Sequence, residues 1–244
     1  MRGRGLRAEV AVRGKAWPVG MLESRGQRGQ DTVGPTHVAV AQTLASLGIV
    51  LKERGQLDEA RSRHEHALRL LEAALGPEHL QTATQRVQLG NVLLDQGLSA
   101  DAQAQHERGL AVLEKALGPE HPQVSKVLVN LGIALAGQGR YDDARRRFER
   151  ALALHEKTFG PAHPDVAVVR INLGGVLADL GQYEQARLQQ ERALAGLEKV
   201  LGPQHPLLSI PRTLLGRALT GLGRYDEAQR QLERALALQA QPQD

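Results

Sequence analysis

The chain has 244 residues, of which 41% are hydrophobic but only 2% aromatic, and its apolar content is mostly Leu, Ala and Val. Such a composition favours helices that pack closely through small side chains. The absence of cysteine excludes disulfides, thiolate metal sites and cysteine nucleophiles. No segment has the roughly 20 consecutive apolar residues of a membrane span, and the N-terminus lacks the apolar region of a secretory signal. We therefore expect a soluble, cytoplasmic protein.

Residues 1–33 account for the net charge of +4, because they carry seven Lys or Arg against three acidic residues while the rest of the chain balances at 24 against 24. We expect this basic segment to be disordered and separate from the folded region. An alternative is an electrostatic arm that touches nucleic acid or acidic partners. Charge confined to a tail is poor evidence for a nucleic-acid-binding domain, so nucleic acid is the least favoured partner.

From residue 34 onward the sequence repeats itself every 42 residues. Each unit opens with Gly-Pro, followed two places later by His, and this signature recurs at residues 34, 76, 118, 160 and 202. The constant register divides the chain into five units, 34–75, 76–117, 118–159, 160–201 and 202–243. The signature predicts a turn and a capped helix start, because Pro is favoured in the first turn of a helix.

Each unit predicts a first amphipathic helix. Leucines four residues apart, such as Leu131 and Leu135, mark its apolar face, and a glycine follows the first of them. A second glycine column closes this helix, because glycine readily takes the left-handed conformation found at helix ends. That column consists of Gly55, Gly97, Gly139, Gly181 and Gly223.

A second helix follows in each unit. Four of the five units place an acidic residue near its start, which suits the positive end of the helix dipole. Small residues such as Gly48 and Ala60 leave room where the two helices of a pair approach. One pair cannot bury both of its faces, so the pairs should stack into an all-α solenoid of five helix-turn-helix units.

The string Asn-Leu-Gly-x-x-Leu-x-x-x-Gly-x-Tyr-x-x-Ala occurs at residues 130–144 and again at 172–186. It resembles the tetratricopeptide repeat (TPR), and the 42-residue period with Gly-Pro-x-His-Pro is similar to the kinesin light chain type, which also occurs in many bacterial multi-repeat proteins. The resemblance implies a right-handed superhelix. It also implies a non-catalytic adaptor that binds a peptide or a partner protein on an inner surface lined by the first helices.

The resemblance places candidate peptide-binding residues on the first helices of the units. They are Gln88, Asn91, Lys126, Asn130, Asn172 and Arg217. Amides satisfy the backbone of an extended peptide, and Lys126, four residues before Asn130, would hold a carboxylate. Arg86, Arg170 and Arg212 lie in one column nearby and would add positive charge. The alternative is that these are ordinary solvated residues.

Neither metal binding nor catalysis is indicated. The signature histidines occur once per unit, too far apart to share a metal ion. His64 and His106 stand in the column of Phe148, which predicts packing at a helix interface. The repeated Glu-Arg column predicts a solvated or inter-repeat ion-pair network, because a catalytic site needs one asymmetric constellation. We therefore expect no enzyme, no cofactor and no small-molecule substrate.

The main alternative function is a role in assembly. No further polar helix follows the fifth unit, although terminal repeats of such arrays normally present a polar outer face. Self-association through the terminal units, or docking on another domain of a larger complex, would cover the apolar ends. A membrane is not expected among the partners.

Overall fold

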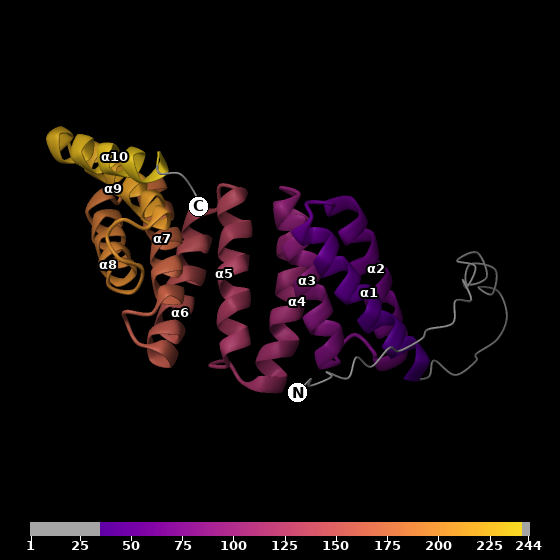
Figure 1. Cartoon of the computed structure of the whole chain (residues 1–244). Coiled ribbons are helices and arrows are strands. Elements are labelled where there is room, and N and C mark those ends of the chain that lie inside the picture. Colours follow the sequence, from indigo (N-terminus) through magenta and orange to yellow (C-terminus); the bar gives the residue numbers. More distant parts are fainter. Residues whose placement is uncertain (1–34, 241–244) are drawn as a thin grey trace, which may run out of the picture. The chain divides into compact units, whose positions relative to one another are not determined.

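The computed structural model describes residues 35–240, so the expectations for residues 1–33 lie outside the described residues. Every element in the described range is helical (Figure 1). The elements are α1 (Pro35–Glu53), α2 (Leu57–Leu75), α3 (Leu80–Asp95), α4 (Ser99–Leu117), α5 (Pro122–Gly137), α6 (Tyr141–Phe159), α7 (Pro164–Asp179), α8 (Tyr183–Leu201), the 3₁₀ turn η2 (Pro206–Leu208), α9 (Ser209–Gly221) and α10 (Tyr225–Gln239). In this range no helix is long and apolar enough to span a membrane.

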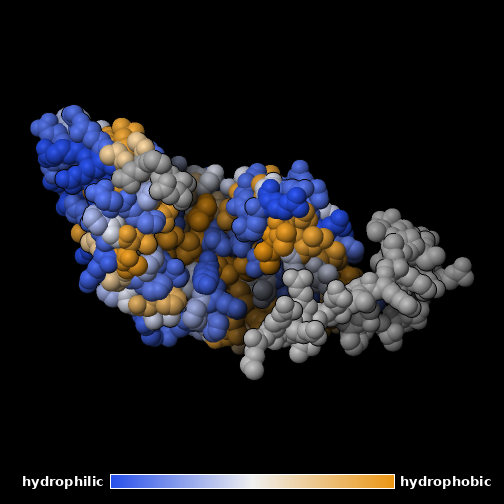
Figure 2. Space-filling view, in the orientation of Figure 1, coloured by the Kyte–Doolittle hydropathy of each residue, from blue (hydrophilic) through white to orange (hydrophobic). Residues whose placement is uncertain are grey.

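The helices form five hairpins, in which each odd-numbered helix packs on the even-numbered helix that follows it. Each even-numbered helix also packs on the first helix of the next hairpin, and consecutive odd-numbered helices touch from α3 to α9. The predicted all-α array of five stacked helix pairs is therefore confirmed. On the face drawn in Figure 2, hydrophilic side chains predominate and hydrophobic ones gather in separate patches.

The turn inside each hairpin depends on the predicted second glycine column. These glycines have φ between 72° and 76°, in the left-handed region that other residues avoid. At the end of α1, the N–H of Gly55 donates to the Lys52 carbonyl at 2.8 Å, and the N–H of Gln56 donates to the Leu51 carbonyl at 2.9 Å. These are the two bonds of a Schellman motif, which satisfy carbonyls that the helix end leaves unpaired.

The Gly-Pro-x-His signature forms the turn between hairpins, as predicted. His79, His121, His163 and His205 each cap a helix start, because the Nδ1 atom accepts a hydrogen bond from the N–H two residues later at 3.1 to 3.2 Å. The preceding glycines also have φ of 82° to 89°, a second left-handed position that the sequence reasoning did not identify. In the first unit the helix already begins at Pro35.

Close approach within each hairpin depends on the glycine that follows the first leucine. A Cβ atom at Gly132 would lie 2.7 Å from the Phe148 ring, and one at Gly90 would lie 2.6 Å from Nε2 of His106. The residue sixteen positions after each such glycine fills the space above it. His106 is fully buried there, so its predicted role in interface packing is confirmed.

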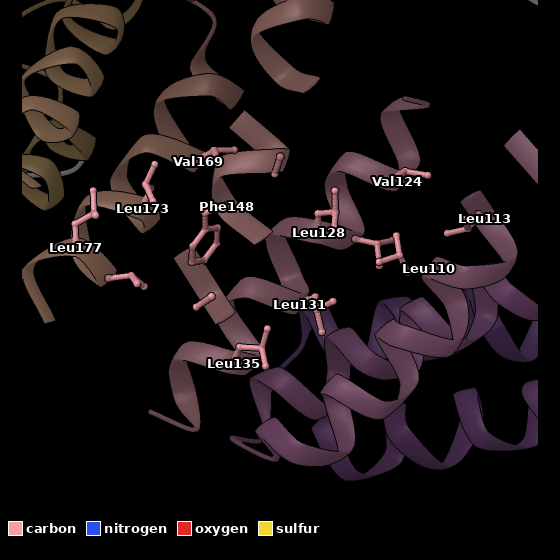
Figure 3. Close-up of a cluster of buried hydrophobic side chains, with 14 of the residues drawn as sticks. Leu110, Leu113, Val124, Leu128, Leu131, Leu135, Phe148, Val169, Leu173 and Leu177 are labelled. Carbon is pink, nitrogen blue, oxygen red and sulfur yellow. The ribbon is translucent and has the colours of Figure 1, made fainter. Parts of the chain in front are cut away.

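The buried side chains link one hairpin to the next. The largest apolar cluster extends from α3 to α9, with Leu131 and Phe148 at 0% and 1% exposure near its middle (Figure 3). Burying a side chain of this size contributes about 1.5–3 kcal/mol. The core is therefore continuous from α3 to α9, and it fixes these odd-numbered helices side by side.

Candidate functional site

The exposed sides of the odd-numbered helices form one surface, because side chains connect α1 to α3, α3 to α5 and α7 to α9, and α5 lies beside α7. Lys52 of α1 forms an ion pair with Asp95 of α3 at 3.0 Å, and Arg217 of α9 forms one with Asp179 of α7 at 3.2 Å. All six predicted binding residues belong to these helices. We define the odd-helix surface by Gln42, Gln88, Asn91, Lys126, Asn130, Val168, Asn172, Ile210 and Arg217.

Three of the predicted residues meet in a hydrogen-bonded network on α3 and α5. The amide of Asn130 donates to Oδ1 of Asn91 at 2.8 Å, and the amide of Asn91 lies 3.4 Å from Oε1 of Gln88. Nε2 of His106, on α4, donates to the same Oδ1 of Asn91 at 3.0 Å. The sequence reasoning did not anticipate this link, which fixes Asn91 and joins two hairpins.

Lys126 lies apart from this network. It is exposed and lines a hollow of about 220 Å³ between α5 and α7, together with Asp165 and Val168. Asn130 does not line this hollow, so the two neighbours face partly different surroundings. Among the described residues, no ion pair involves Lys126, and its ammonium group is therefore available to an added carboxylate.

Asn172 and Arg217 are more engaged than the sequence suggests. The amide of Asn172 donates to the Val168 carbonyl one turn earlier, at 3.1 Å. The Arg217 guanidinium donates to the Gly175 carbonyl at 2.7 Å in addition to its ion pair with Asp179. Arg217 therefore joins α9 to α7, although its side chain stays exposed.

A second hollow, of about 280 Å³, lies between α1 and α3. Glutamines dominate its polar lining, and Gln123 reaches it from α5. Of these, Gln85 is held in place because its amide donates to Nδ1 of His64 at 2.9 Å and to the His64 carbonyl at 3.0 Å. The lining glutamines are Gln42, Gln81, Gln85 and Gln123.

Exposed apolar side chains occupy the other end of the odd-helix surface. Val168 is 50% exposed on α7, and Ile210 is 52% exposed on α9. Leu207, in the turn before α9, is 54% exposed. The sequence reasoning looked for polar residues and missed these positions, although Val168 and Ile210 stand in the column of Lys126. Apolar and polar side chains are therefore mixed along the surface, because Ile49 of α1 and Ile133 of α5, in the column of Asn91 and Arg217, are also 44% and 39% exposed.

The prediction that Arg86, Arg170 and Arg212 add positive charge to this surface is wrong. Their exposure is only 6% to 8%, and each is paired with a glutamate fourteen residues earlier, on the preceding even-numbered helix. Burial lowers the pKa of Arg170, against the effect of the Glu156 carboxylate. These arginines therefore join neighbouring hairpins from within.

The second hairpin junction, between α4 and α5, lacks such an arginine, because Leu128 stands in that column. There the carboxylate of Glu114 pairs instead with Arg150 of α6 at 2.6 Å. Arg150 belongs to the repeated Glu-Arg column. The predicted inter-repeat ion pair is therefore present at this position.

One buried pair has the composition of a nucleophile and a base. Ser125 of α5 and Nδ1 of His155 on α6 are hydrogen-bonded, and both also lie within hydrogen-bond distance of the Ala151 carbonyl. Their exposure is 2% and 4%, which leaves the hydroxyl almost no access for a substrate. The contact joins the two helices of one hairpin.

Two buried histidines, His64 and His106, have lowered pKa values. Burial lowers the pKa of His106 to about 4, and it also lowers the pKa of His64 despite the hydrogen bond from Gln85. Both rings are therefore neutral near pH 7. They act as packing groups and hydrogen-bond partners rather than as charges.

Comparison with solved structures shows the same arrangement of helices elsewhere. The TPR-like repeats of a kinesin light chain-like protein from Podospora anserina are 26% identical, with a TM-score of 0.70 over 82% of this chain and 94% of that chain. BtubC (BKLC) from P. vanneervenii is 20% identical, with a TM-score of 0.71 over 85% of each chain. A Rap protein complexed with Competence and Sporulation Factor is 16% identical, with a TM-score of 0.65 over 85% of this chain and 57% of that chain.

No curated protein matches the sequence. The family model of the tetratricopeptide repeat, in contrast, matches it four times in overlapping windows, at residues 38–115, 84–157, 123–199 and 173–241. These windows together span nearly all of the helical array. The chain therefore belongs to the tetratricopeptide repeat family.

Proposed function

We propose that this protein is a non-catalytic scaffold whose odd-helix surface binds an extended peptide or a segment of a partner protein. The observation that supports this most directly is the mixture of amides and exposed apolar side chains along that surface. Glutamines line the hollow at α1 and α3, and the exposure of Ile49, Ile133, Val168 and Ile210 is 39% to 52%. On the odd-helix surface, exposed apolar side chains lie near amide side chains, as in a peptide-binding surface.

The polar groups left on this surface suit a peptide backbone. In the described part of the chain, no protein donor reaches Oδ1 of Asn130 or Oδ1 of Asn172. Amide oxygens of this kind accept backbone N–H groups, and the carbonyls of the peptide find donors in the glutamine side chains. The ammonium group of Lys126 adds a preference for an acidic residue near the middle of the ligand.

The comparisons support a binding role in general terms. Tetratricopeptide repeats typically serve as interaction scaffolds, and one structural neighbour is a Rap protein solved in complex with Competence and Sporulation Factor. The partner of the present chain has to be defined by its chemistry. We propose a segment with apolar side chains toward α9 and an acidic side chain beside Lys126. Cytoplasmic placement stays a prediction.

The experiment is a selection of peptides from a random phage-displayed library on the full chain, followed by affinity measurements with a labelled selected peptide. We expect apolar peptides that contain an acidic residue. Lys126→Glu should weaken binding roughly tenfold or more, because it turns an attraction into a repulsion. Val168→Asp should do the same by placing a charge on the apolar end.

The control is Leu188→Asp, since Leu188 is 38% exposed on the even-numbered helix α8. It adds the same charge outside the odd-helix surface and should leave binding unchanged. All three positions are exposed, so thermal unfolding should be nearly the same in each variant. Selected peptides that bind Lys126→Glu and Val168→Asp as tightly as the native chain would contradict the proposal.

A further inference from the structure

The first helix of the array exposes an apolar face, and the equivalent face is buried in every later unit. Val40, Leu47 and Val50 of α1 are 41%, 43% and 55% exposed, and hydrophobic side chains gather where Figure 1 draws α1 (Figure 2). The residues equivalent to Leu47 in the other units are at most 4% exposed. They are Leu89, Leu131, Leu173 and Leu215. In those units the preceding hairpin covers this face.

The last helix presents the opposite half of the same contact. Leu236 of α10 is 65% exposed, whereas its equivalents Leu68, Leu110 and Leu194 are 6% to 8% exposed. Leu232 is 37% exposed, although the side chains in its column are otherwise buried. Inside the array, these columns pack on the first helix of the following hairpin, as Leu68 packs in one cluster with Leu89.

We infer that a second copy of this chain continues the array: α10 of one copy packs on α1 of the next, as α2 packs on α3 within a copy. The 42-residue period gives the contacts directly, because each residue of α10 corresponds to one of α2 and each residue of α1 to one of α3. The Leu68 and Leu89 contact becomes Leu236 on Leu47 of the second copy.

The polar edge of this junction is complementary as well. Within the chain, Gln96 donates to the Asp58 carboxylate at 2.8 Å across the first junction. The equivalent residues at the ends are Arg54 and Asp226, which have opposite charges and are both exposed. Among the described residues neither belongs to an ion pair. Asp226 of one copy can therefore form an ion pair with Arg54 of the next.

The arginine and histidine side chains that are buried at the internal junctions have no charged or imidazole counterpart on either of the two end faces. The column of the buried arginine holds Leu44 in the first unit, and the column of its glutamate partner holds Ala240 in the last. Likewise, His64 and Gln85 are hydrogen-bonded across the first junction, and the equivalent positions in a stack are Leu232 of one copy and Thr43 of the next. Stacking two copies would therefore leave no buried charge or imidazole without a partner, which is the usual penalty of a mismatched interface.

Such a contact joins two different surfaces, so it is heterologous and does not close on itself. Each copy that adds to a stack carries a fresh α10 face, and the stack can grow in one direction. This inference concerns the ends of the array and is independent of the function proposed for the odd-helix surface.

The test is sedimentation velocity of the full chain over a concentration series. We expect species larger than a monomer that increase with concentration. Leu47→Asp or Leu236→Asp alone should reduce each sample to monomer, with apparent association at least roughly tenfold weaker. Leu188→Asp, on a face of α8 away from both ends, should associate like the native chain.

Mixing the two variants identifies the geometry. Leu47→Asp retains a native α10 face and Leu236→Asp retains a native α1 face, so an equal mixture should form a complex of two chains that grows no further. The swap Arg54→Asp with Asp226→Arg in one chain should restore association that either change alone weakens. A mixture that stays monomeric, or a double exchange that fails to recover, overturns the inference.

Two other occupants of these faces predict different results. A symmetric pair of α1 faces would leave Leu236→Asp dimeric while Leu47→Asp is monomeric. If residues 1–33 of the same chain cover α1, the full chain should stay monomeric at every concentration, and removing those residues should permit association. Either result would exclude the stack for the full chain.

Discussion

At the scale of single residues, the space above one glycine column decides how close the two helices of a hairpin lie. The side chain that fills this space varies between units: His64, His106, Phe148, Gln190 and Leu232. All of them contact the backbone of the facing glycine more closely than a Cβ atom would allow. The glycines are therefore a steric requirement, whereas the chemistry of the opposite residue is free to vary.

Replacing one of these glycines should destabilise the fold. In Gly132→Ala the new methyl group would lie 2.7 Å from the rigid ring of Phe148, so the helices must separate. We expect a loss of about 1–3 kcal/mol in the free energy of unfolding, measured with urea. Gly175→Ala is the matched control, because nothing lies within 4 Å of its added Cβ. It should be neutral or slightly stabilising, since alanine favours a helix; equal losses in both variants would contradict the steric explanation.

The buried imidazole of His106 should make stability depend on pH. Its folded-state pKa of about 4 lies below the unfolded value of about 6.5, so the unfolded chain binds the proton more readily. The stabilisation is complete above pH 6.5 and is lost as the pH falls toward 4, by up to roughly 3 kcal/mol. Urea unfolding at pH 7.5 and pH 5 measures the difference.

His106→Gln should reduce that pH dependence, because Gln190 fills the equivalent space without titrating, and the lowered pKa of His64 contributes to what remains. His66→Gln, at an exposed position of α2, serves as the control and should leave the profile as it is. A profile that is unchanged in His106→Gln would assign the pH dependence to other groups.

At the scale of helices, buried arginines connect one hairpin to the next. The guanidinium of Arg170 pairs with Glu156 and also donates to Oε1 of Gln189 at 3.0 Å. This places one charged side chain, 7% exposed, among residues of three successive helices. Where Leu128 takes the place of arginine, apolar packing provides the contact instead.

Removing this arginine should therefore weaken the junction. Arg170→Ala leaves a void and an unpaired carboxylate, but Glu156 retains about a third of its exposure, so we expect a moderate loss of about 1–3 kcal/mol. Arg170→Leu should cost less, because leucine fills this position in the third unit. Arg61→Ala, which breaks an exposed pair on α2, should change stability by less than about 0.5 kcal/mol. Chemical denaturation compares the three variants.

The number, length and order of the helices follow from the sequence because the same glycines and leucines recur in one register. The sequence did not reveal that the arginine column is buried. A charged residue beside an apolar stripe is expected to be exposed unless its ion-pair partner is known. That partner, Glu156 for Arg170, lies on the preceding hairpin. The Asn91 and Asn130 contact was hidden for the same reason, because it joins residues 39 positions apart.

At the scale of the whole molecule, each inner hairpin is covered on two sides and each terminal hairpin on one. In an array of this kind, stability is roughly the sum of the hairpins and of the contacts between neighbours. The largest apolar cluster extends from α3 to α9 and does not include α1, α2 or α10. The terminal helices are therefore held by fewer contacts than α5 or α6.

Amide hydrogen exchange followed by mass spectrometry should show this gradient. In dilute solution we expect α1 and α10 to exchange fastest and α5 and α6 slowest, because opening an end breaks only one hairpin junction.

If copies stack end to end, raising the concentration should slow exchange in α1 and α10 together and leave α5 unaffected. The concentration effect should vanish in Leu236→Asp, while the gradient of the dilute chain persists. Uniform exchange from α1 to α10 in dilute solution would mean that the array unfolds as a single unit, and that its ends are no weaker than its centre.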